Sequence, residues 1–173
     1  MSGIERPGAG EHHEYFTLYT SKVPDGDVLG TLSTQAGAVK TAFASFGSSG
    51  SLHRYAPGKW SVREILGHLC DTERLFVYRG LTFARGDTTD LPGMEEDAWV
   101  AGARFDDVPL PDLLAEFDHV RSATLALFRT FDAEVLSRRG TANGSAMTVR
   151  SVPWIIAGHV AHHLGVLEER YRS

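Results

Sequence analysis

The sequence has little of several features that would each mark a class of protein. It contains one cysteine, Cys70, in 173 residues, so an internal disulfide framework is excluded and a cytoplasmic setting is expected. No apolar run approaches the roughly 20 residues that a membrane-spanning helix needs, and the N-terminal stretch lacks the apolar core of a secretory signal. The net charge is -5, whereas nucleic-acid binding rests on clustered positive charge. We therefore expect neither a membrane nor a nucleic acid among its partners.

What is present is the composition of an ordinary globular protein. Hydrophobic residues make up 42% of the chain and charged residues 23%, which fits neither a disordered nor a membrane protein. A chain of this length can bury roughly 70% of the surface that it exposes when unfolded. We expect one domain over residues 1–173, in which about residues 1–14 form a flexible N-terminal arm.

Four segments show helical periodicity, each with apolar residues at alternating spacings of four and three. They run from about Asp27 to Phe46, from Ser61 to about Phe83, from near Pro111, and from near Ser151. In the third segment the repeating positions are Leu113, Phe117, Val120, Thr124, Leu127 and Phe131. Asp27 is a suitable N-cap, Ser61 and Glu64 form a capping-box pattern, and Pro153 is tolerable in the first turn of the last helix. Repeated spacings of this kind are typical of the seam of a helical bundle.

Two connections carry turn signals. The stretch "RGDTTDLPGMEEDAWVAGARFDDVPLP" between the second and third helices is long enough for a lid or a crossover, with a short helix around Glu95–Val100. The stretch "RRGTANGSAMT" contains Asn143–Gly144 and predicts a small hairpin before the last helix. The sequence therefore predicts an all-α protein, a four-helix bundle with a long crossover loop between helices 2 and 3.

The last helix, "PWIIAGHVAHHLGVLEERY", places histidines among its apolar residues. His159 and His163 continue the seam spacing, and residues four apart lie on one helix face with Cβ atoms about 5–6 Å apart. His68, one turn after Ile65, supplies a third inward-facing imidazole. Three imidazoles from two helices with an open fourth position are typical of a catalytic metal site. His162 could replace His163 as a ligand, and a metal-free, hydrogen-bonded histidine network is the alternative.

Charged residues on the second helix could support such a site. Glu64 and Asp71 lie four residues before and three after His68, so either could orient an imidazole or accept a proton. The capping role already explains Glu64, which makes Asp71 the stronger catalytic candidate. Arg74 and Arg79 could hold an anionic substrate or could simply be solvated helix charges.

Three blocks of sequence resemble a known family. "YAPGKWSVREILGHLCDTERLFVYR", "LPGMEEDAW" and "IIAGHVAHHLGVLEERY" closely resemble the DinB-like (DinB/YfiT-like) superfamily of metalloenzymes, over about residues 15–172. The resemblance implies a four-helix bundle in which one histidine of the second helix and an H-x-x-x-H pair of the last bind a divalent metal ion, usually Zn²⁺ or Ni²⁺. In this sequence those positions are His68, His159 and His163, and all three are filled.

The resemblance also suggests a class of reaction. Members include thiol-S-transferases and a mycothiol-dependent isomerase, in which the metal ion would lower the pKa of a thiol. It therefore implies an enzyme of the thiol-S-transferase type, with a small-molecule thiol as substrate. A metal-dependent hydrolase and a non-catalytic protein stapled by its metal are the alternatives. Relatives are often dimers, so a homodimer is a further expectation.

Overall fold

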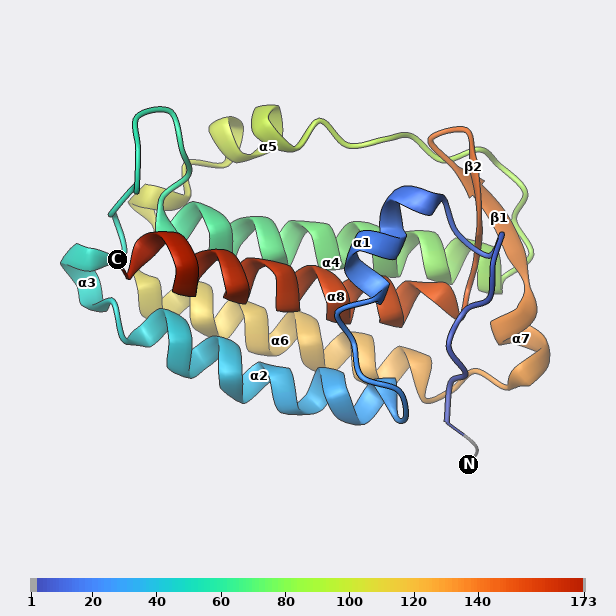
Figure 1. Ribbon diagram of the computed structural model, residues 1–173. Coiled ribbons are helices and arrows are strands. Elements are labelled where there is room, and N and C mark those ends of the chain that lie inside the picture. Colours follow the sequence, from blue (N-terminus) through green and yellow to red (C-terminus); the bar gives the residue numbers. More distant parts are fainter. Residues whose placement is uncertain (1–2, 173) are drawn as a thin grey trace.

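The computed structural model describes residues 3–172 and has four long helices lying side by side (Figure 1). These are α2 (Val28–Ala44), α4 (Val62–Ala84), α6 (Leu110–Phe128) and α8 (Ser151–Val166). A π-helical turn, η3 (Leu167–Tyr171), continues α8. The predicted all-α four-helix bundle is thus confirmed. None of the helices in residues 3–172 is long and apolar enough to cross a membrane.

The helices begin where the local signals place them. The Asp27 carboxylate accepts a hydrogen bond from the Leu29 amide at 3.0 Å at the start of α2. At the start of α4, the Ser61 side chain accepts from the Glu64 amide while the Glu64 carboxylate accepts from the Ser61 amide, which is the predicted capping box. Pro153 lies in the first turn of α8, where its missing amide proton costs no helical hydrogen bond.

The seam predicted for the third helix is wrong at its C-terminal end. Leu127 and Phe131 are only partly buried, whereas Phe128 is fully buried. An α-helix has 3.6 residues per turn, so a strict alternation of four and three drifts off the core face after a few turns. The helix also ends at Phe128, and Phe131 packs onto its ring from the following loop, with 5.4 Å between ring centroids.

The long connection between α4 and α6 carries α5 (Glu96–Ala103) and a 3-10 turn, η2 (Phe105–Asp107). It passes the hairpin of β1 (Arg139–Ala142) and β2 (Ser145–Thr148), which follows the short α7 (Ala133–Ser137), and then runs along the outside of the bundle to α5 (Figure 1). The hairpin is antiparallel, and Asn143 and Gly144 both have positive φ, as its predicted two-residue turn requires. Hydrogen bonds from the Leu91 amide to the Thr141 carbonyl and from the Asn143 amide to the Leu91 carbonyl tie the connection to the hairpin.

The N-terminal segment, for which flexibility stays a prediction, contacts the rest of the protein at Ile4 and Glu11. Ile4 is buried, and the Glu11 carboxylate accepts hydrogen bonds from Arg150. A 3-10 turn, η1 (Glu14–Phe16), then leads into α1 (Thr17–Thr20), which lies against α8. Since α1 and the hairpin cover α8, residues 151–160 of that helix are buried on every side.

Gly158 allows α1 to approach α8 closely. A Cβ at this position would lie 2.1 Å from the Tyr19 carbonyl oxygen, a backbone atom. We expect Gly158→Ala to destabilise the protein by about 1–3 kcal/mol, because α1 must move away. Gly165 lies on the same helix with no atom of the described residues within 4 Å of its would-be Cβ, so Gly165→Ala should be neutral or stabilising by about 1 kcal/mol. Urea unfolding followed by circular dichroism measures both, and equal effects would contradict the close approach.

The core has two hydrophobic clusters separated by a polar layer. One cluster includes Phe83 and Trp154, and the other includes Phe43 and Phe117. The buried polar side chains between them come from α4, α6 and α8: His68, Thr72, Glu73, Arg121, Thr124 and His159. A short helix, α3 (Gly47–Gly50), closes the end of α2. The polar layer contains the histidines that the sequence singles out.

Candidate metal centre

Three imidazoles meet between α4 and α8. The Nε2 atoms of His68 and of His163 each lie 3.1 Å from Nε2 of His159. One ligand nitrogen from each ring lies within 4.8 Å of the other two, a grouping that could hold a metal ion. His162 points elsewhere: its ring lies edge-on to that of Tyr19, 5.6 Å between centroids. The structure thus brings together the three histidines favoured from the sequence and leaves His162 beside them.

Burial keeps these histidines neutral. Only 4% of His68 and 7% of His159 is exposed. Burial lowers the pKa of His68 to about 4, and burial together with the neighbouring His68 and His162 lowers the pKa of His163 to about 3. The pKa of His159 falls well below its ordinary value for the same reasons. At neutral pH all three rings therefore carry a free lone pair, which is the form that binds metal.

The three histidine nitrogens are better arranged to bind a divalent cation than to form hydrogen bonds with one another. The Nε2 of a neutral imidazole has either one proton or one lone pair, so His159 Nε2 can make one good hydrogen bond to a neighbour but faces two. A cation that takes all three lone pairs removes this conflict. With metal–nitrogen bonds of about 2.0–2.1 Å, octahedral or tetrahedral angles separate the nitrogens by roughly 2.8–3.4 Å, a range that includes the observed 3.1 Å.

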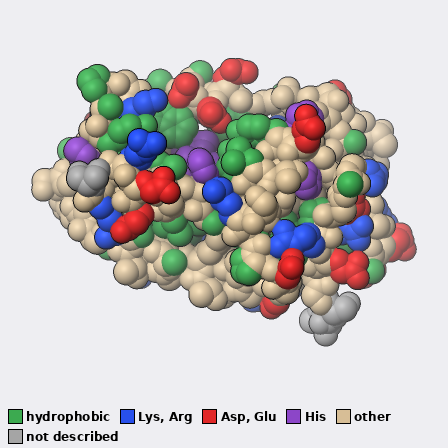
Figure 2. Space-filling view, viewed as in Figure 1, with side chains coloured by type: hydrophobic (Ala, Val, Ile, Leu, Met, Phe, Trp, Pro, Cys, Tyr) green, Lys and Arg blue, Asp and Glu red, His purple; other side chains and the backbone are tan. Residues whose placement is uncertain are grey.

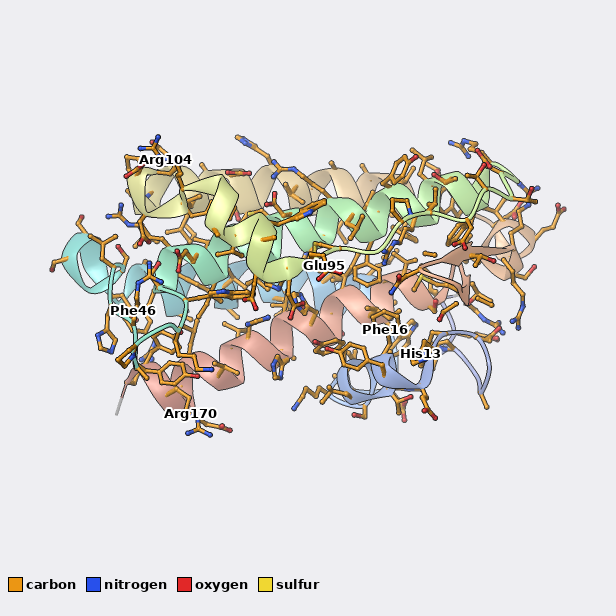
Figure 3. The ribbon with its side chains drawn as sticks, turned by 90° about the horizontal axis from the view of Figure 1, so that it is seen from above. His13, Phe16, Phe46, Glu95, Arg104 and Arg170 are labelled. Carbon is orange, nitrogen blue, oxygen red and sulfur yellow. The ribbon has the colours of Figure 1, made fainter. Side chains whose placement is uncertain are left out.

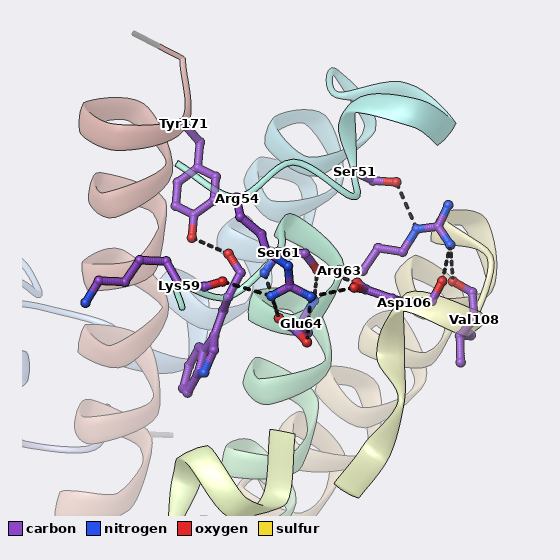
Figure 4. Close-up of polar contacts among 10 residues, drawn as sticks. Ser51, Arg54, Lys59, Ser61, Arg63, Glu64, Asp106, Val108 and Tyr171 are labelled. Carbon is purple, nitrogen blue, oxygen red and sulfur yellow. Dashed lines mark hydrogen bonds and ion pairs between the residues drawn. The ribbon is translucent and has the colours of Figure 1, made fainter. Parts of the chain in front are cut away.

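Trp60 forms one wall of the site. Its ring lies 4.7 Å from that of His68 and is stacked on His163 at 6.5 Å, measured between centroids. The Tyr171 hydroxyl donates to the Trp60 carbonyl at 2.6 Å (Figure 4), and the Trp60 indole N–H donates to Asp97 of α5 at 3.1 Å. His163 Nδ1 is buried and has no hydrogen-bond partner among the described residues.

Glu64 belongs to the network around the start of α4. Besides capping the helix, its carboxylate accepts hydrogen bonds from Arg54, which also pairs with Asp106 at 2.6 Å (Figure 4). Arg63 donates to the carbonyls of Asp106 and Val108 at 2.9 and 3.0 Å. These contacts hold the connection to α6 against α4, so Glu64 is occupied by a structural role, as its capping pattern indicated.

Asp71 belongs to an ion-pair network between α4 and α6. Within the described residues its carboxylate pairs with Arg74 at 3.5 Å, and Arg74 pairs in turn with Glu116 of α6 at 2.5 Å. Burial raises the pKa of Asp71, although the Arg74 charge offsets part of that effect. The role expected for Asp71 as a proton acceptor or an orienting partner stays a prediction. On α4, the Thr72 hydroxyl lies close to the site, 3.4 Å from His68 Nδ1.

A cavity of about 430 Å³ opens beside the histidines, with His68 and His159 in its wall. Histidine side chains are visible in a recess on the face shown in Figure 2. Seen from above, His13 and Phe16 lie on one side of α8, and Glu95, next to the start of α5, lies on the other (Figure 3). The connection before α5, the hairpin and α1 therefore surround a space large enough for a small molecule.

Two cavity residues could not be assigned from the sequence. Tyr19 lies edge-on to His159, with 5.3 Å between centroids, and burial raises the pKa of its hydroxyl, which stays protonated at neutral pH. It comes from a segment without a periodic pattern, so no sequence signal indicated it. Arg79 was a candidate for binding an anion, but only the structure shows that it is buried and lines this cavity.

Comparison with known proteins places these observations in a family. The model of the DinB superfamily matches residues 32–167. Among solved structures, the chain is similar to YfiT from Bacillus subtilis, a probable metal-dependent hydrolase with an unusual four-helix bundle topology. The two share 19% sequence identity with a TM-score of 0.74, over 97% of this chain and 93% of that one, a likeness that concerns the fold. Comparison with curated proteins gave no match.

Proposed function

The chain belongs to the DinB superfamily, and on this premise we propose that it is a metal-dependent enzyme whose ion, Zn²⁺ or Ni²⁺, is held by His68, His159 and His163. One observation carries the proposal: three neutral imidazole nitrogens converge, and two of the three rings, His68 and His159, line a cavity. A divalent ion bound there would act as a Lewis acid and lower the pKa of a thiol or a water molecule at its open position.

The reaction that we favour is transfer of a low-molecular-weight thiol to an electrophile. The resemblance to thiol-S-transferases supports it, and so does the size of the cavity. The thiol must come from outside, because Cys70 is fully buried and burial raises the pKa of its thiol. Within the cavity, the Tyr19 hydroxyl keeps its proton and can donate a hydrogen bond to a bound substrate.

Hydrolysis is the second candidate, since YfiT is described as a probable metal-dependent hydrolase and shares this fold. The same three histidines would serve, with water in place of the thiol. A metal-stapled protein without turnover would need a site closed by a fourth protein ligand. The cavity next to His68 and His159 favours an open site instead.

A thermal-shift experiment separates thiol chemistry from the other two functions. In metal-loaded protein, a thiol at 100 times its Kd should add about 2.7 kcal/mol of stability and raise Tm by roughly 5–10 °C. Its S-methyl derivative, which cannot form a thiolate, should have no such effect, and neither thiol nor derivative should stabilise metal-free protein. Equal shifts with the thiol and its S-methyl derivative would rule out a thiolate at the metal ion.

A further inference from the structure

Arg79 is a buried cation without an anionic partner. Only 5% of it is exposed, and it lines the same cavity as His68 and His159. Its Nη2 donates to the Pro92 carbonyl at 2.8 Å, and its guanidinium lies over the Phe76 ring, 5.2 Å from the centroid. Its Nε is buried and has no hydrogen-bond partner among residues 3–172. Within that range it forms no ion pair with a carboxylate, which leaves its charge uncompensated.

Arg121 is also buried, but its charge is compensated by a carboxylate. Arg121 is paired through two hydrogen bonds with Glu73, at 2.9 and 2.7 Å. A guanidinium removed from water without a counterion is costly, and burial accordingly lowers the pKa of Arg79. An anion that enters the cavity and reaches the guanidinium would offset this cost with a charge-assisted hydrogen bond.

The position of Arg79 sets the reach of such a ligand. His68, Thr72, Phe76 and Arg79 follow one another at spacings of four, four and three, so all four line the cavity from one face of α4. The rise from residue 68 to residue 79 is about 16 Å along the helix axis. Helix side chains lean toward the N-terminus, and the guanidinium over Phe76 leans in this direction. The gap between the guanidinium and the histidines is therefore on the order of 10 Å or less.

We infer that Arg79 binds a carboxylate of the substrate while the reactive group of the same molecule lies at the three histidines. The assignment of the reactive end rests on the proposed function. A single carboxylate suits the site better than a phosphate dianion, because one guanidinium supplies one positive charge. In addition, the Glu96 side chain, also in the cavity wall, disfavours a second negative charge. The substrate class is thus a small carboxylic acid with a spacer of several bonds between its two functional groups.

A pair of probes tests the inference: 6-mercaptohexanoate and 6-mercaptohexanol have the same thiol and chain length and differ in the carboxylate. Isothermal titration of zinc-loaded wild-type protein should give an affinity for the carboxylate about 10-fold or more above that for the alcohol. Arg79→Gln should abolish this preference and leave the affinity for the alcohol unchanged. Arg79→Lys should keep part of it, and the matched control Arg74→Gln, an exposed arginine of the same helix, should keep all of it.

The outcomes also separate this inference from the proposed function. If zinc-loaded wild-type protein binds both thiols equally, the inference is overturned and the metal site stands. If Arg79→Gln weakens both thiols alike, the residue only anchors the Pro92 carbonyl, and the inference is again overturned. If the protein takes up no zinc and binds neither thiol, the proposed function fails. Hexanoate and hexanol, titrated by NMR, then decide: a carboxylate preference that depends on Arg79 supports the inference, and equal binding overturns it.

Discussion

Replacing Arg121 with alanine is expected to lower the free energy of unfolding by about 3–5 kcal/mol. The side chains of Arg121 and Glu73 are each 1% exposed, and Nη1 of Arg121 also donates to the Leu32 carbonyl at 2.7 Å. One guanidinium therefore joins α6 to α4 and α2 in the polar layer of the core. The substitution would leave the Glu73 carboxylate buried with no counterion. Because domains of this kind are stable by about 5–15 kcal/mol, the variant should lose a large part of its stability.

Urea unfolding with matched variants checks this expectation. Arg74 also pairs with a glutamate, Glu116, but its side chain is 50% exposed, so Arg74→Ala should cost about 1 kcal/mol or less. The double variant Arg121→Met, Glu73→Leu removes both charges together and should recover much of the loss. Similar losses for Arg121→Ala and Arg74→Ala would show that burial of the pair does not determine its contribution.

The elements of the fold could be predicted because their signals are local. The capping box at Ser61 and Glu64 and the Asn143–Gly144 turn act over a few residues, and the structure has both. The burial of α8 on all sides could not be predicted in this way. This burial depends on α1 and on the hairpin. The segment α1 is distant from α8 in the sequence, and the contacts of the hairpin with α8 do not follow from any residue spacing. The packing of Ile4 and Glu11 at the N-terminus has the same origin.

In the candidate site, too, the part that follows from local spacing could be predicted and the part that depends on tertiary contacts could not. His159 and His163 share one helix, so their proximity follows from a spacing of four, and the seam pattern of α4 brings His68 toward them. Arg74 and Arg79 look equivalent in the sequence. Only tertiary structure gives Arg74 a partner in Glu116 and leaves Arg79 buried beside Pro92. Arg121 follows Val120 on the predicted seam, and nothing local shows that Glu73 lies opposite it.

His159→Ala is expected to abolish metal binding. Its Nε2 faces both other histidines, so its loss leaves two ligands that no longer share a common neighbour. Elemental analysis of protein purified without a nickel column should find about one Zn²⁺ or Ni²⁺ per wild-type chain and almost none in the variant. At free metal of about 1,000 Kd, binding adds roughly 4 kcal/mol of stability, so a chelator should lower the Tm of the wild type and not that of His159→Ala.

The neighbouring histidine provides the control. His162 lies one position from His163 but outside the trio, so His162→Ala should keep its metal, whereas His163→Ala should lose it. If His162→Ala lost its metal and His163→Ala kept it, His162 and not His163 would be the ligand. Equal metal in wild type and His159→Ala would place the ion elsewhere. A wild type that holds no metal and ignores the chelator would leave a hydrogen-bonded network, which must then satisfy three converging Nε2 atoms by itself; the single proton or lone pair of His159 Nε2 argues against that outcome.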